Sequence, residues 1–253
     1  MRRWKRPGHD RVAEILGNLD ADFLLRANCY FGGGTQIALA NGEYRESRDV
    51  DFICSSRDGF RTLREAVRED TLGRIFRREM VLARGVRADR DGIRTFIASN
   101  PPVPPVKFEI LLEARIDAAG SMDVDLGVPA LNPESAVAEK LLANVDRGLD
   151  ESVHSRDLVD LAFLAKAHGA GTLRAGLSKA QAAYGAAVLD YLERTVRRLH
   201  EDRAWFRMCV NDLLVDDEKG LRLGLRALRS FLHAARTNYP AVSLKPGRAA
   251  GKR

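Results

Sequence analysis

Residues 31–52, FGGGTQIALANGEYRESRDVDF, constrain the fold more than any other segment, because a glycine cluster is joined to two aspartates by one short helical segment. Successive glycines let backbone N–H groups approach phosphate oxygens, and the N-terminus of the following helix adds partial positive charge. Asp49 and Asp51 are two residues apart on a predicted strand, so both side chains lie on one face and could hold a divalent metal together. The segment therefore predicts a site for phosphoryl or nucleotidyl transfer.

Apolar periodicity in the first half of the chain predicts alternating helices and strands, with hairpin-like spacing around Asp91–Gly92. This order favours a mixed or antiparallel sheet over a doubly wound parallel one. The expected strands are 29–31, 50–54, 80–87, 93–98 and 106–112, with a short last one near 125–128. The expected helices begin near residue 10 and cover 35–40 and 60–69.

Strand signals stop after Asn132-Pro133-Glu134, which supplies a helix N-cap, a first-turn proline and a first-turn acid. Helical patterns then cover 133–144, 155–167, 172–184, 186–201, 204–214 and 217–234. The sequence thus predicts an α+β fold in two domains. An α/β domain is expected over residues 1–130, a helical domain over 131–240, and a flexible tail over 241–253.

The charge balance favours an anionic partner such as RNA. The chain has 253 residues and a formal net charge of +6, from 41 Lys and Arg against 35 Asp and Glu. Arginine predominates, and its guanidinium suits bidentate phosphate contacts, although genomic base composition is an alternative reason for the excess. Three distant cysteines give no zinc or disulfide spacing, and no apolar run is long enough to cross a membrane. We expect a cytoplasmic protein without a membrane partner.

Three further residues are candidates for the same chemistry. Glu109 lies beside Lys107 on one face of a later strand, where a third carboxylate would complete a two-metal cluster or serve as a general base. A surface Lys–Glu strand face is the alternative. Lys140 borders an apolar helical stripe and is expected to neutralise phosphate charge from a cleft. Asp157, three residues before Asp160 on one helix face, could orient that lysine, a base or a substrate hydroxyl.

Two common nucleotide-binding classes are disfavoured. No Lys-Ser or Lys-Thr follows Gly-Gly-Gly-Thr, as a P-loop requires, and the G-x-G-x-x-G spacing of dinucleotide folds is absent. The histidines lack metal-ligand spacing and are assigned no metal.

Taken in order, five segments resemble the nucleotidyltransferase toxins of the AbiEii/AbiGii type, which include the MenT-like toxins of type IV toxin–antitoxin pairs. The resemblance covers residues 30–165. It departs from the pattern at an additional glycine, Gly32, and at Thr35, where many nucleotidyltransferases have serine. The segments are Gly33-Gly34-Thr35, Ser47-Arg48-Asp49-Val50-Asp51-Phe52, Lys107-Phe108-Glu109, Glu139-Lys140-Leu141 and Arg156-Asp157-Leu158-Val159-Asp160-Leu161.

The resemblance implies a DNA-polymerase-β-like nucleotidyltransferase domain with a mixed sheet, followed by a C-terminal helical domain. It also implies a Mg²⁺-dependent (or Mn²⁺-dependent) enzyme that transfers nucleotides from an NTP to RNA, above all to the tRNA 3′ end, and so blocks translation. A cognate antitoxin protein encoded nearby would be its partner. By motif position, the triphosphate would meet Gly33, Gly34, Thr35 and Lys140. The metal would be held by Asp49, Asp51 and Glu109, and the further catalytic residues would be Lys140 and Asp157.

Two other functions remain open at this point. One is nucleotidyl transfer to a protein or small-molecule hydroxyl, and the other is a non-catalytic binding protein on the same fold. The helical half adds little beyond residue 165. Its Arg194, Arg197 and Arg198 would suit either an RNA-binding surface or a solvated helix face.

Overall fold

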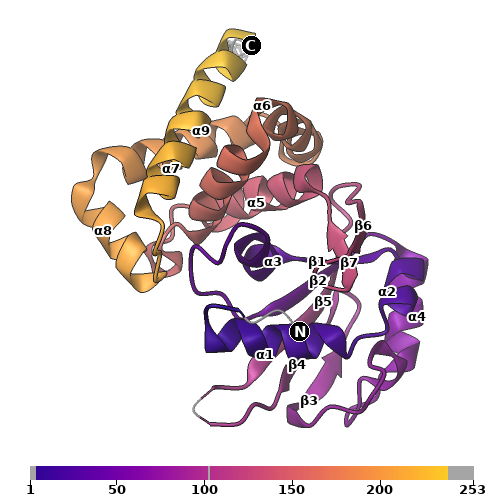
Figure 1. Cartoon of the computed structure of the whole chain (residues 1–253). Helices are drawn as coiled ribbons and strands as arrows, with labels where there is room; N and C mark the ends of the chain where they lie inside the picture. The colour runs from indigo at the N-terminus through magenta and orange to yellow at the C-terminus, as the bar shows by residue number, and fades with distance from the viewer. Residues whose placement is uncertain (1–3, 102, 239–253) are drawn as a thin grey trace, which may run out of the picture.

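The computed structural model describes residues 4–101 and 103–238 (Figure 1). Its strands are β1 (Cys29–Gly32), β2 (Val50–Cys54), β3 (Leu82–Ala88), β4 (Gly92–Ile97), β5 (Val106–Leu112), β6 (Gly120–Asp123) and β7 (Val128–Leu131). The helices among and before the strands are α1 (Pro7–Gly17), α2 (Ala21–Arg26), α3 (Gly33–Ala40), α4 (Arg57–Ala66) and the 3-10 turn η1 (Gly73–Ile75). After the last strand follow α5 (Pro133–Arg147), the 3-10 turn η2 (Glu151–Val153), α6 (Arg156–Tyr184), α7 (Ala187–Glu201), α8 (Arg203–Asp212) and α9 (Glu218–Asn238).

The strands form one mixed sheet in the order β3-β4-β5-β2-β1-β7-β6. The pairs β2–β5 and β1–β7 are parallel, whereas the pairs β1–β2, β3–β4, β4–β5 and β6–β7 are antiparallel. A glycine turn joins β1 to α3, and the chain returns antiparallel as β2. The turn and the start of β2 therefore lie at the same edge of the sheet.

The two faces of the sheet pack against different helices. On one face, α1, α2 and α4 bury an apolar cluster that includes Phe31, Phe52 and Phe108. On the other face, Tyr30 and Ile53 join a second cluster built by the later helices. Because side chains alternate along a strand, Asp51 lies on this second face together with Ile53. The acidic residues are thus directed toward the helical half of the molecule.

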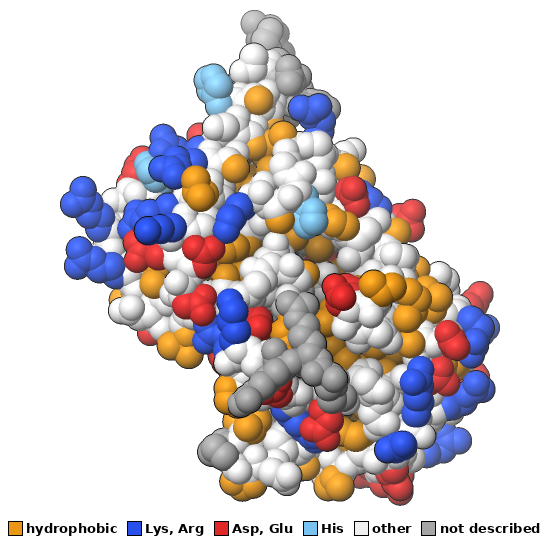
Figure 2. Space-filling model, viewed as in Figure 1, with side chains coloured by type: hydrophobic (Ala, Val, Ile, Leu, Met, Phe, Trp, Pro, Cys, Tyr) orange, Lys and Arg blue, Asp and Glu red, His pale blue; other side chains and the backbone are white. Residues whose placement is uncertain are grey.

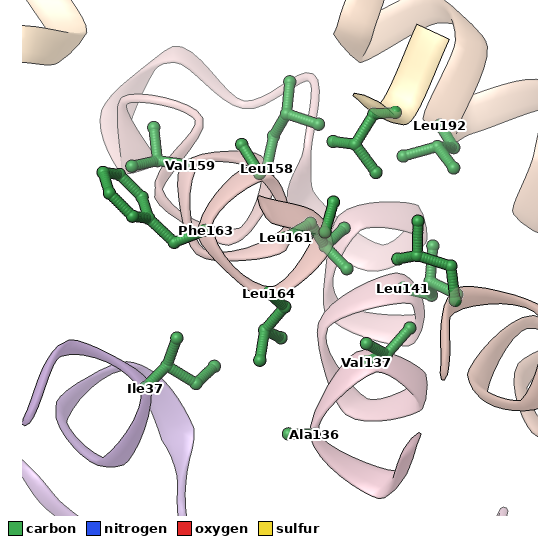
Figure 3. Close-up of a cluster of buried hydrophobic side chains, with 14 of the residues drawn as sticks. Ile37, Ala136, Val137, Leu141, Leu158, Val159, Leu161, Phe163, Leu164 and Leu192 are labelled. Carbon is green, nitrogen blue, oxygen red and sulfur yellow. The ribbon is translucent and has the colours of Figure 1, made fainter. Parts of the chain in front are cut away.

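Helices α5 and α6 form the centre of the second cluster. Figure 3 shows Val137 and Leu141 of α5 beside Leu158 and Leu161 of α6, with Ile37 of α3 nearby. All five side chains are at least 98 % removed from solvent. Burying each large apolar side chain stabilises the fold by about 1.5–3 kcal/mol. This packing fixes the helix that carries the glycine turn against the two helices that carry Lys140 and Asp157.

The α+β class, with a mixed sheet followed by helices, is confirmed. The predicted bounds of β2 and β5 are also confirmed, but the short strand expected near 125–128 is wrong. That segment is mostly the turn of a hairpin between β6 and β7, in which the Asp123 carboxylate accepts backbone N–H bonds from Asp125 and Leu126. The helix α2 was missed, because six residues give too short a pattern. The division into two domains stays a prediction.

Helices 155–167 and 172–184 are joined into α6, which is kinked at Gly169 with φ of +72°. The tail expected over 241–253 lies outside the described residues. Among the helices that the structure describes, none combines the length and the apolar character needed to cross a bilayer.

Candidate active site

The acidic residues predicted from the sequence come together on two neighbouring parallel strands. Asp51 on β2 lies directly opposite Glu109 on β5, and Asp49 precedes β2 by one residue. On the other side of β2, Gly32 at the end of β1 is the register partner of Asp51. The sheet therefore places the glycine turn and the three carboxyl groups at one edge.

The glycine turn packs directly against charged side chains. Gly33 has φ of +70°, and a Cβ on it would lie 2.7 Å from the Asp51 Oδ2. A Cβ on Gly34 would lie 2.0 Å from the Arg45 Nη2. Both positions thus require glycine for close contact with these side chains, in addition to any contact with a phosphate.

Thr35 lies behind this turn. Its side chain is fully buried, and its hydroxyl forms a 2.8 Å hydrogen bond with the hydroxyl of Ser47. Ser47 in turn lines the pocket described below. The hydroxyl nearest to a bound ligand on this side is therefore that of Ser47, with Thr35 supporting it.

The helical wall supplies a lysine and two aspartates. The Lys140 Nζ on α5 lies 2.9 Å from the Asp157 Oδ1 and 2.7 Å from the Asp160 Oδ2, both on α6. Asn132 caps α5 by accepting a 2.9 Å bond from the Ser135 backbone N–H, which sets the start of the helix. Asp157 lies in the first turn of α6, where the helix dipole favours a negative charge.

Arg147 and Arg45 complete this charge cluster. Arg147 Nε donates to the Asp157 Oδ2 at 2.7 Å. The Arg45 guanidinium bonds both oxygens of Asp160, at 2.7 and 2.9 Å. The Tyr44 hydroxyl also donates to Asp160, at 2.6 Å. All carboxylate oxygens of both aspartates therefore accept hydrogen bonds from cationic groups.

Burial and pairing determine the protonation states in this cluster. Burial alone would raise the pKa of Asp157 and Asp160, but their cationic partners hold both pKa values below the ordinary range. Burial would likewise lower the pKa of Lys140, and the two aspartates raise it instead. Lys140 is thus positively charged, and both aspartates are negatively charged, at neutral pH.

Asp51 behaves differently. Burial raises its pKa to about 6, and the negative charges of Asp49 and Glu109 add to this rise, while Lys107 opposes it. The carboxylates of β2 and β5 therefore repel one another and favour an added cation between them. Glu109 is in part neutralised already, because Lys107 donates to its Oε2 and the Arg94 Nε lies 3.2 Å from its Oε1.

The strand carboxylates and the helical cluster face one pocket of about 290 Å³. It is lined by Gly33, Gly34, Arg45, Ser47, Asp49, Asp51, Ile53, Lys107, Glu109, Leu111, Arg115, Glu139, Lys140, Ala143, Asp146, Arg147, Arg156 and Asp157. Basic and acidic side chains are equally numerous in this lining, so a bound polyphosphate would need additional positive charge.

A further acidic pair lies at the wall formed by β5 and α5. The Arg115 guanidinium bonds Glu113 at 2.6 Å and approaches Glu139 to 3.9 Å. Burial and the charge of Glu113 raise the pKa of Glu139 to about 8, although Arg115 opposes the rise. The Oε1 of Glu139 is buried and finds no hydrogen-bond partner among the residues that the structure describes. A protonated Glu139 therefore presents an unused polar atom beside the pocket.

The fit of a metal ion depends on Asp49 and Asp51. Across residues 4–101 and 103–238, no three His, Cys, Asp or Glu side chains are arranged as a ready metal-binding group. Two mutually repelling carboxylates at the glycine turn are nevertheless the oxygen donors that Mg²⁺ and Mn²⁺ prefer. Glu109 could join them only if its contacts with Lys107 and Arg94 loosened.

Gly33, Gly34, Asp49, Asp51, Glu109, Lys140 and Asp157 all line the pocket. Its charged residues Arg45, Arg115, Glu139, Asp146 and Arg147 were not among the site residues predicted from the sequence. Arg45 carries no local signal, since its partner Asp160 is 115 positions away, whereas Arg147 pairs with Asp157 ten positions on, at the start of the next long helix. Glu139 did have a local signal, because an acidic residue next to a lysine on an apolar helical stripe has to be either buried or paired.

Comparison with known proteins agrees with this geometry. The family model described as "Nucleotidyl transferase AbiEii toxin, Type IV TA system" matches residues 14–234. A crystal structure of a candidate nucleotidyltransferase from H. pylori superposes with a TM-score of 0.51 at 18% identity, covering 91% of this chain and 94% of that one. At this identity the likeness concerns the fold alone.

A second structure, an antigenic nucleotidyltransferase-like protein from Paracoccidioides brasiliensis, gives a TM-score of 0.34 at 11% identity, covering 87% of this chain and 92% of that one. A search of curated proteins finds no match. The family match extends over most of the chain, from α1 through α9, and includes every residue of the pocket. The chain therefore belongs to the AbiEii family of nucleotidyl transferase toxins of type IV toxin–antitoxin systems.

Proposed function

We propose that the chain transfers a nucleotidyl group from an NTP to a 3′-hydroxyl of RNA, above all the 3′ end of tRNA, and so blocks translation. The observation that carries this proposal is the two-sided pocket. Asp49 and Asp51 on the sheet face a charged Lys140 that two buried aspartates hold in place. Membership of the toxin family adds an antitoxin as partner.

The pocket supports an in-line displacement. The RNA 3′-oxygen forms a bond to the α-phosphorus, the bond from that phosphorus to the β-phosphate oxygen breaks, and pyrophosphate leaves. The hydroxyl proton passes to a carboxylate, for which Asp51 and Glu109 are the candidates on the strand side. Lys140 is positively charged and would stabilise the triphosphate and the leaving pyrophosphate.

The other residues position these groups. Asp157 and Asp160 hold the Lys140 ammonium at the pocket wall, and Arg147 keeps Asp157 ionised. Gly33 and Gly34 leave room at the turn for the phosphates. Asp49 and Asp51, with Glu109 as a third donor, would hold Mg²⁺ or Mn²⁺. Such an ion would supply charge neutralisation at the phosphates and lower the pKa of the attacking hydroxyl.

A labelling assay tests the proposal. The purified chain is incubated with each α-labelled NTP, Mg²⁺ and total RNA, and label is followed in RNA, in protein and in small molecules. We expect label in RNA of tRNA size, and none with Asp49→Asn or Asp51→Asn. The exposed Asp58→Asn on α4 is the matched control and should label RNA like the unchanged chain.

Each other outcome contradicts a definite part of the proposal. Label in protein or in a small molecule instead of RNA would show that RNA is not the acceptor. Absence of label anywhere would favour a non-catalytic binding protein on this fold. Transfer that persists in Asp49→Asn and Asp51→Asn would exclude these aspartates as essential ligands.

A further inference from the structure

A basic hollow, separate from the candidate active site, lies in the helical half, between the C-terminal end of α7 and the helices α8 and α9. Its volume is about 570 Å³. It is lined by Leu199, His200, Arg203, Phe206, Arg207, Arg222, Leu225 and Arg226, and we call it the α8–α9 groove. No carboxylate is among the lining residues within the described part of the chain. The groove therefore concentrates positive charge that its lining residues do not neutralise.

The four arginines form two rows. Arg203 and Arg207 are four residues apart on α8, and Arg222 and Arg226 are four residues apart on α9. Residues at this spacing lie on one helix face with about 5–6 Å between their Cβ atoms. This is comparable with the separation of neighbouring phosphates along a nucleic acid strand. All four side chains are exposed, and Figure 2 shows blue Lys and Arg side chains gathered at the upper left, where Figure 1 places α7, α8 and α9.

Pairing leaves most of this charge available. Arg222 is bonded to Glu218 at 2.7 Å and stacks 4.1 Å from the ring of Phe206. In residues 4–101 and 103–238, no ion pair engages Arg203, Arg207 or Arg226. Exposed guanidiniums that face one another repel unless an anion lies between them. Planar guanidiniums also bind the oxygens of a phosphate in pairs, and successive arginines on one helix face can follow successive phosphates of a strand.

A hydrogen bond connects the helix that carries part of the groove to the segment that begins the helical wall of the candidate active site. The Trp205 Nε1 on α8 donates to the Ser155 Oγ at 3.0 Å. Ser155 is next to Arg156, which lines the pocket, and Trp205 is two residues from Arg203, which lines the groove. The first turns of α8 and α6 are thus in contact, which links the helix that carries the groove to the helix that carries Arg156 and Asp157.

A rival basic surface lies between α4 and the edge strand β3. It is larger, about 940 Å³, and is lined by Arg61, Arg64, Arg68, Arg84 and Arg87, but also by Glu65 and Glu69. Moreover, α4 packs on the face of the sheet opposite to the pocket. Its mixed charge and its position make it the weaker candidate for a polyanion that must reach the pocket.

We propose that the α8–α9 groove binds the sugar–phosphate backbone of the RNA whose 3′ end enters the pocket. The inference rests on the proposed RNA acceptor and adds the surface that holds the body of that RNA. Binding is electrostatic, so each arginine that contacts a phosphate contributes about 0.9 to the slope of log K against log salt for a duplex.

RNA binding, measured without NTP, tests the groove separately from catalysis. A fluorescein-labelled RNA hairpin with a single-stranded 3′ end is titrated with the chain at several salt concentrations. Arg203→Gln/Arg207→Gln should weaken binding roughly 10- to 60-fold near 0.1 M salt and reduce the slope by about 1.8. Arg203→Lys/Arg207→Lys should keep most of the slope, because the charge remains.

Two control variants each remove two arginines from other surfaces, so they separate the effect of lost charge from the effect of its position. Arg26→Gln/Arg174→Gln removes two exposed arginines on α2 and α6 and should change RNA affinity less than twofold. Arg61→Gln/Arg64→Gln removes two from the rival surface and should also have little effect. Equal far-UV circular dichroism of all variants establishes that each is folded.

Three results would overturn the groove assignment. The first is an unchanged RNA affinity in Arg203→Gln/Arg207→Gln. The second is a lower RNA affinity in Arg61→Gln/Arg64→Gln, the pair on the rival surface. The groove pair could instead abolish binding of poly-L-glutamate while RNA binding persists, which would assign the groove to an acidic protein. The groove and the proposed function fail separately. Transfer to RNA with unchanged binding in the groove variant sinks only the groove, whereas groove-dependent RNA binding without transfer sinks only the reaction.

Discussion

Replacing Asp160 by asparagine should destabilise the fold more than any other single change of similar size in the charge cluster. The side chain is fully buried and accepts bonds from Tyr44 at 2.6 Å, Arg45 at 2.7 and 2.9 Å, and Lys140 at 2.7 Å. Asparagine keeps the shape but removes the charge, and its NH₂ group opposes the cationic donors. Arg45 and Lys140 are then buried with less compensation.

The expected loss is about 3–5 kcal/mol in the free energy of unfolding, the typical cost of breaking a buried ion pair on one side. Total stability in single domains is about 5–15 kcal/mol, so a loss of this size removes a large share of it. Urea titration followed by far-UV circular dichroism measures the loss directly. The slope of free energy against urea has to stay constant for the comparison to hold.

Two further variants make the measurement decisive. Glu218→Gln breaks the exposed pair with Arg222, and should cost no more than about 0.5 kcal/mol. Arg45→Met/Asp160→Leu removes the Arg45 charge together with the carboxylate and should recover part of the stability, since only Lys140 and the Tyr44 hydroxyl then lose a buried partner. A loss below about 1 kcal/mol in Asp160→Asn would refute the reasoning that buried charge pairing holds the pocket wall together.

Three other perturbations have defined outcomes. The pKa values of Asp157 and Asp160 in the folded chain lie below the ordinary 3.8, so the unfolded chain binds more protons at low pH. The contribution of these two groups to the urea midpoint should therefore be constant above about pH 4 and should fall below it. A midpoint that rises on acidification would contradict this. The pKa of Glu139 is about 8 in the folded chain against an ordinary 4.5. Its contribution to the free energy of unfolding should therefore decline as the pH rises from 4.5 to about 8. The urea midpoints of Glu139→Gln should lack that decline. Gly33 and Gly127 both have φ of +70°, so replacing either by alanine should lower the free energy of unfolding by about 1–2 kcal/mol. Only Gly33→Ala places a Cβ against Asp51, so RNA labelling should fall in Gly33→Ala alone. Equal labelling in both variants would disprove a role for that contact.

Local sequence patterns predicted the elements that bury a regular face. The apolar runs of β2 and β5 and the capped start of α5 were expected at the bounds or start residue that the structure has. The strand β6, GSMD, was missed because it is short and lies at the sheet edge with two exposed residues. A four-residue edge strand has no apolar periodicity to detect.

The site was predictable where chemistry and local spacing coincide, as in the aspartates of β2 and the glycine turn. The partner of each charge was not predictable. Arg45 and Asp160 are 115 positions apart, and nothing near either residue indicates the other. Only the packing of α3, α5 and α6, directed by residues such as Ile37 and Leu161, brings them together. The burial of Glu139 likewise depends on tertiary packing beside Glu113 and Arg115.

The distance along the chain between Arg45 and Asp160 also has a consequence during synthesis. At about 5–20 residues per second, a ribosome adds the 115 residues between them in roughly 6 to 23 s. For most of that interval the growing chain has the glycine turn and the strand aspartates but neither Lys140 nor the aspartates of α6. The pocket therefore cannot be complete on a nascent chain until α6 has left the ribosome. The last residues of the charge cluster are therefore supplied late in translation.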